Sequence, residues 1–201
     1  MHTKQALLVL VSGNGSNLQA LIDAERDGRL NKARLAAVIA NTPHAFALER
    51  ARAAGIKALT IMPDKNLPKR ARARDFSDKV LAFAEEHEIE LLVLAGFLLI
   101  LEGDLLTRYA GRIINIHPSL LPKFGGAGMY GARVHETVLA AGETESGCTV
   151  HFVDAGTDTG ARLLQRKVPV LPDDSPQTLA ERIHHEEHRA IVEAVQRLTN
   201  R

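Results

Sequence analysis

Two side chains that could carry acid–base chemistry stand two residues apart in the run NIHPSLLP, residues 115–122. Side chains alternate along a strand, so Asn115 and His117 should project from one face of the predicted strand that ends there. Asparagine offers a neutral donor and acceptor, and histidine can carry a proton near neutral pH, so the pair could hold a developing oxyanion and move a proton. Pro118 and Pro122 fix φ at both ends of PSLLP, which helps to hold these side chains in place. A purely structural histidine at a strand end is the alternative.

A nearby carboxylate would orient the imidazole for this chemistry. The run VHFVDAGTDTGARLLQ supplies His151, Asp154 and Asp158, with both aspartates in a Gly/Thr-rich loop between two predicted strands. Such a loop can bend a carboxylate inward. The alternative is that both aspartates are turn formers, which is a common role for this residue.

A glycine-rich turn follows the first apolar run in LLVLVSGNGSNLQALI. Gly13 and Gly15 permit a tight turn, and Ser16 or Asn17 can cap the helix that follows. Free backbone N–H groups at the start of a helix attract phosphate. The run is neither the dinucleotide fingerprint, because Leu18 replaces the third glycine, nor a P-loop. Phosphate binding and an ordinary turn between strand and helix both remain open at this point.

An apolar loop, LAGFLLILEG, leaves another predicted strand through Gly96. It is too hydrophobic for a free loop, and an apolar slot beside exposed backbone amides would suit a flat heteroaromatic ring. The alternative is that its large side chains are plain core, namely Phe97, Leu98, Ile100 and Leu101.

Short apolar runs alternate with segments of helical period, which is typical of strands buried between covering helices. We expect strands at residues 6–11, 34–40, 58–61, 91–95 and 112–116, and helices near 16–27, 45–54, 71–88 and 103–109. After Gly131 we expect one more helix, two β-rich runs that pair antiparallel (147–153 and 161–171), and a long helix from about Ser175. The pattern predicts an open, mostly parallel α/β sheet with ligands bound beyond the carboxyl ends of its strands.

The composition limits the kinds of partner that the protein is expected to bind. The 201 residues include 25 Lys+Arg against 24 Asp+Glu, which removes any strong electrostatic argument for a nucleic-acid or membrane-surface partner. Cys148 is the single cysteine and cannot form an internal disulfide, and the run 91–101 is shorter than the roughly 20 residues of a spanning helix. We expect no targeting leader at the start of the chain. We expect a soluble, cytoplasmic protein.

Five runs follow one another along the chain: SGNGSNLQA, LAGFLLIL, NIHPSLLPKF, GCTVHFVDAGTDTG and LQRKVPV. Together they resemble the glycinamide ribonucleotide formyltransferases of purine synthesis and cover nearly the whole sequence. The resemblance implies a Rossmann-like fold and one formyltransferase domain over residues 1–201. It also implies transfer of the formyl group of 10-formyltetrahydrofolate to the amine of phosphoribosylglycinamide on the way to IMP. Small-molecule substrates, no nucleic-acid or membrane partner, and a monomer or homodimer are expected with it.

The resemblance also implies roles for particular residues. Asn115 and His117 would stabilise the oxyanion formed when the amine attacks the formyl carbon, and Asp158 would assist proton transfer. The folate is expected to meet Arg74, Leu98, Leu99, Ile100, Leu101, Asn115, Asp154, Ala155, Gly156, Thr157 and Asp158. The ribonucleotide is expected to meet Gly15, Ser16, Asn17, His184 and Glu187. Neither a metal nor a covalent nucleophile is required.

The chain departs from the family pattern in several places. Leu99 stands where many relatives have arginine, so we expect a polar side-chain contact with the folate to be lost there while a backbone-mediated one survives. His184 stands where glutamine is frequent. The run KFGGAGMYGARVHE is longer and richer in glycine, and could act as a mobile lid. Arg72 competes with Arg74 for the ligand contact, or both belong to a solvated helix face. HHEEH at 184–188 has His185 where a zinc-binding H-E-x-x-H needs glutamate, so we expect no metal there.

Two other functions stay open from sequence alone. The first is another formyl-transfer enzyme, acting on methionyl-tRNA or a nucleotide sugar or hydrolysing the folate, although those enzymes usually carry an extra domain. The second is a non-catalytic nucleotide- or folate-binding module, because fold alone does not establish function.

Overall fold

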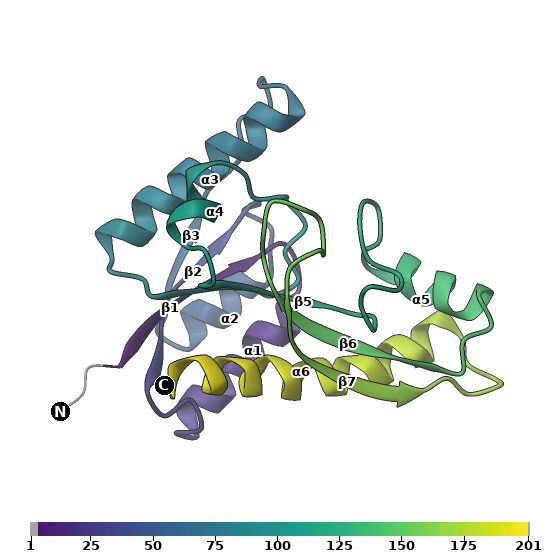
Figure 1. Cartoon of the computed structure of the whole chain (residues 1–201). Helices are drawn as coiled ribbons and strands as arrows, with labels where there is room; N and C mark the ends of the chain where they lie inside the picture. Colours follow the sequence, from purple (N-terminus) through teal and green to yellow (C-terminus); the bar gives the residue numbers. More distant parts are fainter. Residues whose placement is uncertain (1–3, 201) are drawn as a thin grey trace.

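The computed structural model describes residues 4–200, which form one seven-stranded sheet with helices on both faces (Figure 1). The strands are β1 (Gln5–Val11), β2 (Ala33–Ala40), β3 (Lys57–Thr60), β4 (Leu91–Leu94), β5 (Ile113–His117), β6 (Glu145–Phe152) and β7 (Arg162–Pro169). The helices are α1 (Ser16–Arg26), α2 (Ala47–Ala53), α3 (Lys69–Glu86), α4 (Asp104–Arg108), α5 (Ala132–Ala140) and α6 (Pro176–Thr199).

The strand order is β3-β2-β1-β4-β5-β6-β7. Strands β1 to β5 run parallel, and β6 is antiparallel to both β5 and β7. This confirms the predicted Rossmann-like sheet with its antiparallel strands in the C-terminal part. The order reverses between β1 and β4, so the loops after these two strands lie side by side at the edge where such sheets bind ligands.

Alternating side chains divide the core into two layers, one on each face of the sheet. Leu7, Val9 and Val11 of β1 pack with the layer under α1, α2 and α6, whereas Leu8 and Leu10 pack with the layer under α3 and α4. Both sets are fully buried, as expected for parallel strands covered on both faces. The two layers hold β1 rigid up to the glycine-rich loop that follows it.

Most predicted boundaries lie within two residues of the observed ones, but the predicted cap of α1 is wrong. Gly15, with φ 78°, precedes the helix in a left-handed conformation, and no side chain caps the first turn. Asn17 instead turns its amide toward α6. The N–H groups at the start of α1 therefore have no side-chain partner, which favours the phosphate interpretation of this loop.

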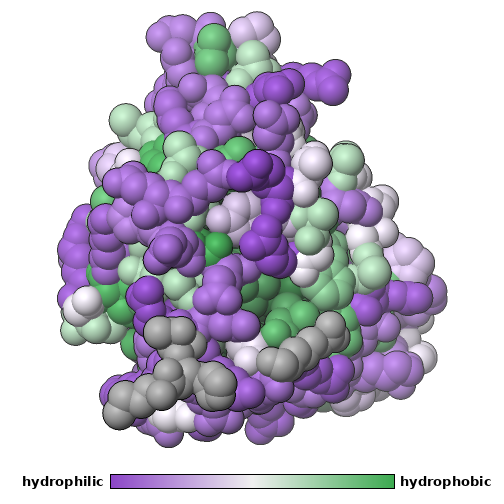
Figure 2. Space-filling view, turned by 60° about the vertical axis from the view of Figure 1, so that its left-hand side comes forward, coloured by the Kyte–Doolittle hydropathy of each residue, from purple (hydrophilic) through white to green (hydrophobic). Residues whose placement is uncertain are grey.

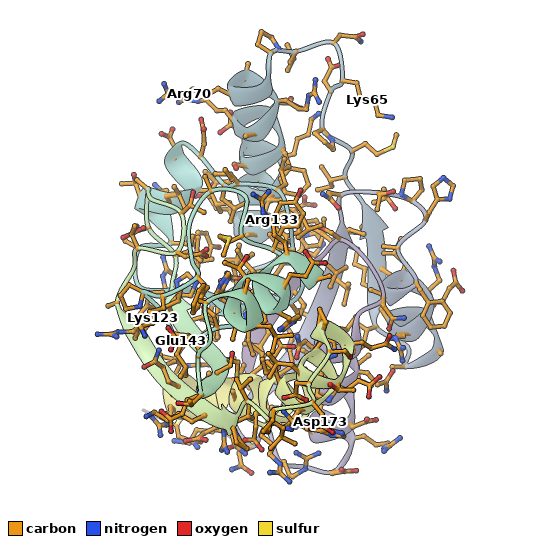
Figure 3. The ribbon with its side chains drawn as sticks, turned by 90° about the vertical axis from the view of Figure 1, so that its right-hand side faces the viewer. Lys65, Arg70, Lys123, Arg133, Glu143 and Asp173 are labelled. Carbon is orange, nitrogen blue, oxygen red and sulfur yellow. The ribbon has the colours of Figure 1, made fainter. Side chains whose placement is uncertain are left out.

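Helix α3 and the loop before it project from the rest of the molecule (Figure 1). Lys65 and Arg70 lie near the free end of this arm in Figure 3. Hydrophilic residues cover most of the face in Figure 2, with hydrophobic patches between them. Within residues 4–200, no helix combines the length and the apolar character needed to cross a bilayer.

Helix α6 lies along the antiparallel part of the sheet. Arg166 of β7 binds Glu193 and Glu186 of this helix, with N–O distances of 2.6 Å and 3.1 Å. Beneath α6, the Cys148 side chain of β6 is fully buried, and burial raises the pKa of its thiol to about 12. A thiol with that pKa is inert toward oxidation and alkylation in the folded protein.

Candidate active site

The carboxyl end of β5 presents Asn115 and His117 on one face of the sheet, as the alternation of side chains predicts. The intervening Ile116, and Ile114 before it, pack into the opposite layer. His117 is only 4% exposed, and its Nε2 lies 2.8 Å from the carbonyl oxygen of Phe124. That bond assigns Nε2 as a donor, so Nδ1 is the nitrogen free to gain or lose a proton.

The neighbouring strand adds His151 to this face. Antiparallel pairing sets His151 of β6 directly opposite Asn115, and the Asn115 Nδ2 lies 3.2 Å from the His151 Nε2. The His151 Nδ1 is 2.9 Å from the Phe152 carbonyl oxygen, so Nδ1 donates and Nε2 accepts from the Asn115 amide. His151 therefore orients Asn115 and leaves the second N–H of that amide free.

The loop between β6 and β7 supplies the carboxylate. Asp158 adopts φ 59°, and its Oδ2 lies 3.5 Å from the His117 Nδ1 while its Oδ1 lies 3.5 Å from the His151 Nε2. The Gly126 N–H donates to the same Oδ2 at 2.9 Å. Because β6 runs antiparallel to β5, this loop must fold back over the sheet to reach His117. The structure thus brings Asn115, His117 and Asp158 together.

Burial and charge set the protonation of this group. Burial lowers the pKa of His117 below its usual value, and the Asp158 charge and the Phe124 carbonyl offset that only in part. Burial would raise the pKa of Asp158, but the hydrogen bond from the Gly126 N–H and the neighbouring His151 and His117 imidazoles outweigh it and hold that pKa low. At neutral pH the Asp158 carboxylate is charged and the His117 imidazole is neutral, so the pair can accept one proton.

The turn-former alternative holds for one aspartate of this loop and not for the other. Asp154 is exposed, and its Oδ1 accepts from the Gly156 N–H at 3.0 Å and from the Thr159 hydroxyl at 2.7 Å. Asp154 therefore shapes the loop that carries Asp158. A cavity of about 440 Å³ opens beside Asp158 and is lined by Gly126, Thr157 and neighbouring residues.

A second polar cluster lies where the start of α1 meets α6. Glu187 is only 5% exposed, and its Oε2 lies 3.5 Å from the Asn17 Nδ2 and 3.7 Å from the His184 Nε2. Burial raises the pKa of Glu187 to about 7, although the Asn17 hydrogen bond works against the shift. The Asn17 Oδ1 is buried with no hydrogen-bond partner. The structure thus joins three of the five residues predicted to meet the ribonucleotide, and Gly15 and Ser16 adjoin Asn17 in the same loop.

The apolar loop after β4 divides between exposed and buried side chains. Leu98 is 61% exposed and Ile100 is 46% exposed, whereas Leu101 is buried and Leu99 packs against the core under α3 and α4. The Leu98 N–H donates to the Ser12 hydroxyl at 2.9 Å, and the Ser12 N–H donates to the Gly96 carbonyl at 3.1 Å. These bonds join the loops after β1 and β4. A contact of Leu98 and Ile100 with a flat ring therefore stays a prediction.

The arginines of α3 are held by other contacts. The Arg72 guanidinium donates to the carbonyls of Lys65 and Leu67, so it fastens the loop before the helix. Arg74 lies between Asp104 and Asp78, with N–O distances of 3.8 Å and 4.0 Å. These pairs are solvent-exposed and weak, so a folate contact for Arg74 stays a prediction.

Sequence reasoning named His151 without giving it a role, and it missed the backbone of the Phe124–Gly126 turn. His151 lies in a run singled out for its aspartates, and the alternation along β6 places it on the same face as Thr149. The pairing register with β5 was needed to bring it to Asn115. Within residues 4–200, no three His, Cys, Asp or Glu side chains converge as metal ligands would.

Fold and site together define an open α/β protein in which an asparagine, a buried histidine and an aspartate meet at the carboxyl end of β5. The sequence model of the formyl transferase family matches residues 5–195. The chain belongs to the formyl transferase family.

Named relatives cover nearly all of the chain. The trifunctional purine biosynthetic protein adenosine-3 of Drosophila melanogaster is 43% identical over 98% of this chain, which spans 14% of that protein. The phosphoribosylglycinamide formyltransferase of Escherichia coli K12 is 41% identical over 90% of this chain and 81% of its own length. The crystal structure of glycinamide ribonucleotide transformylase 1 from Symbiobacterium toebii superposes with a TM-score of 0.89 at 40% identity, covering 98% of this chain and 88% of that one.

Proposed function

We propose that the protein transfers the formyl group of 10-formyltetrahydrofolate to the amine of N1-(5-phospho-D-ribosyl)glycinamide, a step toward IMP, in the cytoplasm. The observation that carries the proposal is the contact of Asp158 with His117 beside Asn115. The names of the relatives at about 40% identity supply the substrates. We further propose that residues 1–201 act as one formyltransferase domain.

In the proposed reaction, the substrate amine nitrogen bonds to the formyl carbon, and the bond from that carbon to the folate N10 breaks. The proton lost by the amine ends on N10, so the exchange needs no outside reactant. The His117–Asp158 pair suits the relay because its neutral imidazole and charged carboxylate accept one proton between them and return it. An imidazolium would be held by Asp158 on one side and the Phe124 carbonyl on the other.

The oxygen of the tetrahedral intermediate needs donors. The second N–H of the Asn115 amide is available, because His151 binds the first. His117 would add its own N–H once Nε2 leaves the Phe124 carbonyl. Losing one such donor typically costs about 10²- to 10³-fold in rate, whereas bringing the two substrates together can contribute on the order of 7 to 11 kcal/mol.

We assign the ribonucleotide to the α1 side of the site and the folate to the β4 side. Phosphate would lie on the amides at Gly15 to Asn17, with Glu187 and His184 near the ribose. Because burial raises the pKa of Glu187 to about 7, this carboxyl opposes a nearby phosphate less than an ordinary glutamate would. The folate ring would lie against Leu98 and Ile100, with its tail toward the loop of Asp154 to Asp158.

The test is turnover by the purified protein. We expect formylated ribonucleotide, detected by mass spectrometry, from 10-formyltetrahydrofolate and phosphoribosylglycinamide, and we expect His117→Ala to abolish it. No turnover in a folded sample would reject the proposal. Formyl loss without an acceptor, or a preference for methionyl-tRNA or a nucleotide sugar, would instead select another member of the family.

A further inference from the structure

Helix α2 touches the glycine-rich loop through two backbone carbonyls. The Ala47 N–H donates to the Gly13 carbonyl at 3.1 Å, and the Arg50 Nε donates to the Asn14 carbonyl at 2.9 Å. The remaining Arg50 nitrogens donate to the Asn14 Oδ1 at 2.8 Å and to the Gln19 Oε1 of α1 at 3.1 Å. Every branch of this guanidinium is therefore used to hold the loop and the helix that follows it.

Because the peptide bond is planar, these contacts also fix the direction in which the loop N–H groups point. In a trans peptide the C=O and the following N–H point in opposite directions. Because α2 holds the carbonyls of Gly13 and Asn14, the N–H groups of Asn14 and Gly15 point away from α2. Two successive amides turned to one side, with the second residue left-handed, form the concave arrangement that binds anions.

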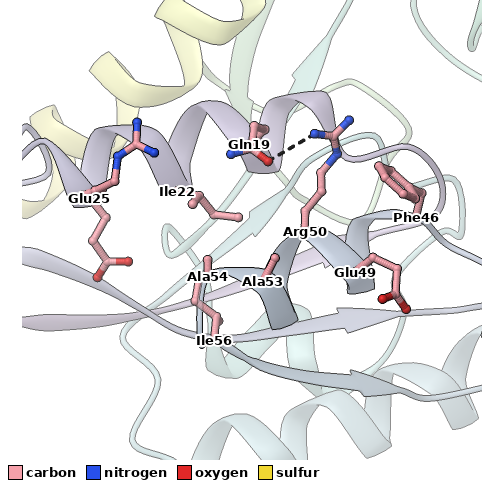
Figure 4. A pocket seen from close by; sticks show the side chains of 10 residues that line it. Gln19, Ile22, Glu25, Phe46, Glu49, Arg50, Ala53, Ala54 and Ile56 are labelled. Carbon is pink, nitrogen blue, oxygen red and sulfur yellow. Dashed lines mark hydrogen bonds between the residues drawn. The ribbon is translucent and has the colours of Figure 1, made fainter.

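The glycine-rich loop also packs closely against α2. A Cβ built on Gly15 would lie 2.6 Å from the Ala47 Cβ, so the loop rests directly on α2. Arg50 also lies 4.9 Å from the centroid of the Phe46 ring, which orients the guanidinium from its other face. In Figure 4 the side chain reaches from α2 across the end of a groove of about 760 Å³ to Gln19 on α1.

We propose that Arg50 is a positioning residue for the phosphate group of the substrate, because its bonds to Asn14 turn the loop amides toward the ligand. The inference rests on the proposed function for the identity of that ligand. Arg50 touches the loop and not the reacting atoms, so its loss should weaken binding of the ribonucleotide and leave the folate subsite unchanged.

The first measurement is steady-state kinetics on Arg50→Met, which keeps an apolar stem but removes the charge and all three donors. We expect KM for the ribonucleotide to rise about 10-fold or more, since a hydrogen bond to a charged group is worth about one factor of ten in an equilibrium constant. KM for 10-formyltetrahydrofolate should stay within about twofold. Arg50→Lys, which retains the charge and one donor group, should recover part of the loss. Arg52→Met is the matched control, because Arg52 on the same helix pairs with Glu49 instead.

The second measurement does not depend on catalysis and uses inorganic phosphate as the probe. Titration followed by the amide NMR signals of residues 14–17 should show phosphate binding to the native protein and to Arg52→Met, with about 10-fold weaker binding to Arg50→Met. Arg50→Lys serves if Arg50→Met does not fold. Unchanged phosphate affinity in a folded Arg50 variant, or no phosphate shifts at this loop in the native protein, overturns the inference. Phosphate binding without formyl transfer would reject the proposed function and leave the Arg50 assignment standing.

Discussion

In the proposed mechanism, Asp158 is the carboxylate that assists proton transfer. Its negative charge raises the pKa of His117 against the effect of burial. Replacing it with asparagine should lower kcat by about 10²- to 10⁴-fold, the usual range for a positioned acid or base. It should also move the acid limb of the pH–rate profile to lower pH, because the imidazole loses the neighbour that favours its protonation.

The control for this experiment is Asp173→Asn, an exposed aspartate in the turn before α6. It should retain native kinetics. A full pH–rate profile of both variants makes the comparison, and an Asp158→Asn enzyme with native kcat and a native profile would remove the carboxylate from the mechanism.

Glu187 should make stability depend on pH in an unusual direction. Its folded-state pKa, about 7, lies above the ordinary value of 4.5, so the folded protein holds this proton more tightly than the unfolded chain does. The stability that the proton supplies is complete below about pH 4.5 and is lost as pH rises toward 7. The loss attributable to this group is about 3 kcal/mol at most.

Urea unfolding at pH 5 and pH 8 checks this prediction. Glu187→Gln should abolish this component of the pH dependence, because glutamine carries no proton to lose. Glu181→Gln, an exposed change on the same helix, should leave it intact. Identical pH dependence in all three proteins would show that Glu187 is ionised without penalty.

The sequence indicated which residues gather at the candidate site better than it indicated the contacts between them. Asn115 and His117 were identifiable because their chemistry is distinctive and strand alternation orders them, whereas only the resemblance to the formyltransferases distinguished Asp158 from Asp154. The contacts of His151 and Arg50 were not predictable, because their partners lie 36 residues away in each case and depend on strand register and helix packing. Arg72 shows the converse: it suggested a ligand contact, yet its donors are used by the carbonyls of its own loop.

At the scale of elements, the loop between β1 and α1 depends on glycine at one position. Gly15 combines a left-handed φ of 78° with a Cβ position 2.6 Å from the Ala47 Cβ. Gly15→Ala should therefore suffer both backbone strain and overpacking, together about 2 to 5 kcal/mol of unfolding free energy. It should also disturb the amides expected to hold phosphate.

Gly28→Ala separates these two costs. Gly28 has a similar φ of 73°, but a Cβ there would meet nothing within 4 Å. It should lose only the backbone term, about 1 to 2 kcal/mol. Denaturation midpoints of the two variants measure the difference, and equal losses would mean that α2 yields readily to the added methyl group.

Hydrophobic periodicity located the strands and the helices to within a few residues. The strands were recognisable because strands buried on both faces read as continuous apolar runs. Periodicity says nothing about strand order. The reversal between β1 and β4, which puts Ser12 against Leu98, is a tertiary fact. The predicted cap of α1 was wrong because Asn17 has the right chemistry for a cap but lies within the first turn, where Gly15 holds the N-cap position and the Asn17 Nδ2 faces the buried Glu187 of α6.

Across the whole molecule, the buried Cys148 reports the integrity of the sheet. The thiol is fully buried and has a pKa of about 12. A thiol-specific labelling reagent should therefore modify it only when β6 separates from α6. The free energy of opening, taken from labelling rates at increasing urea, should equal the global free energy of unfolding. A much smaller value would reveal that this layer opens on its own. Cys148→Ser supplies the blank for reagent background.

The contact between Asn17 and Glu187 joins positions 170 residues apart. A small molecule bound beside Asn17 and Glu187 would contact both α1 and α6, and it would stabilise the packing of the two helices against each other. Its presence should raise the melting temperature with concentration as mass action requires. It should also slow protease cuts within α6, far along the chain from the loop that is proposed to hold phosphate.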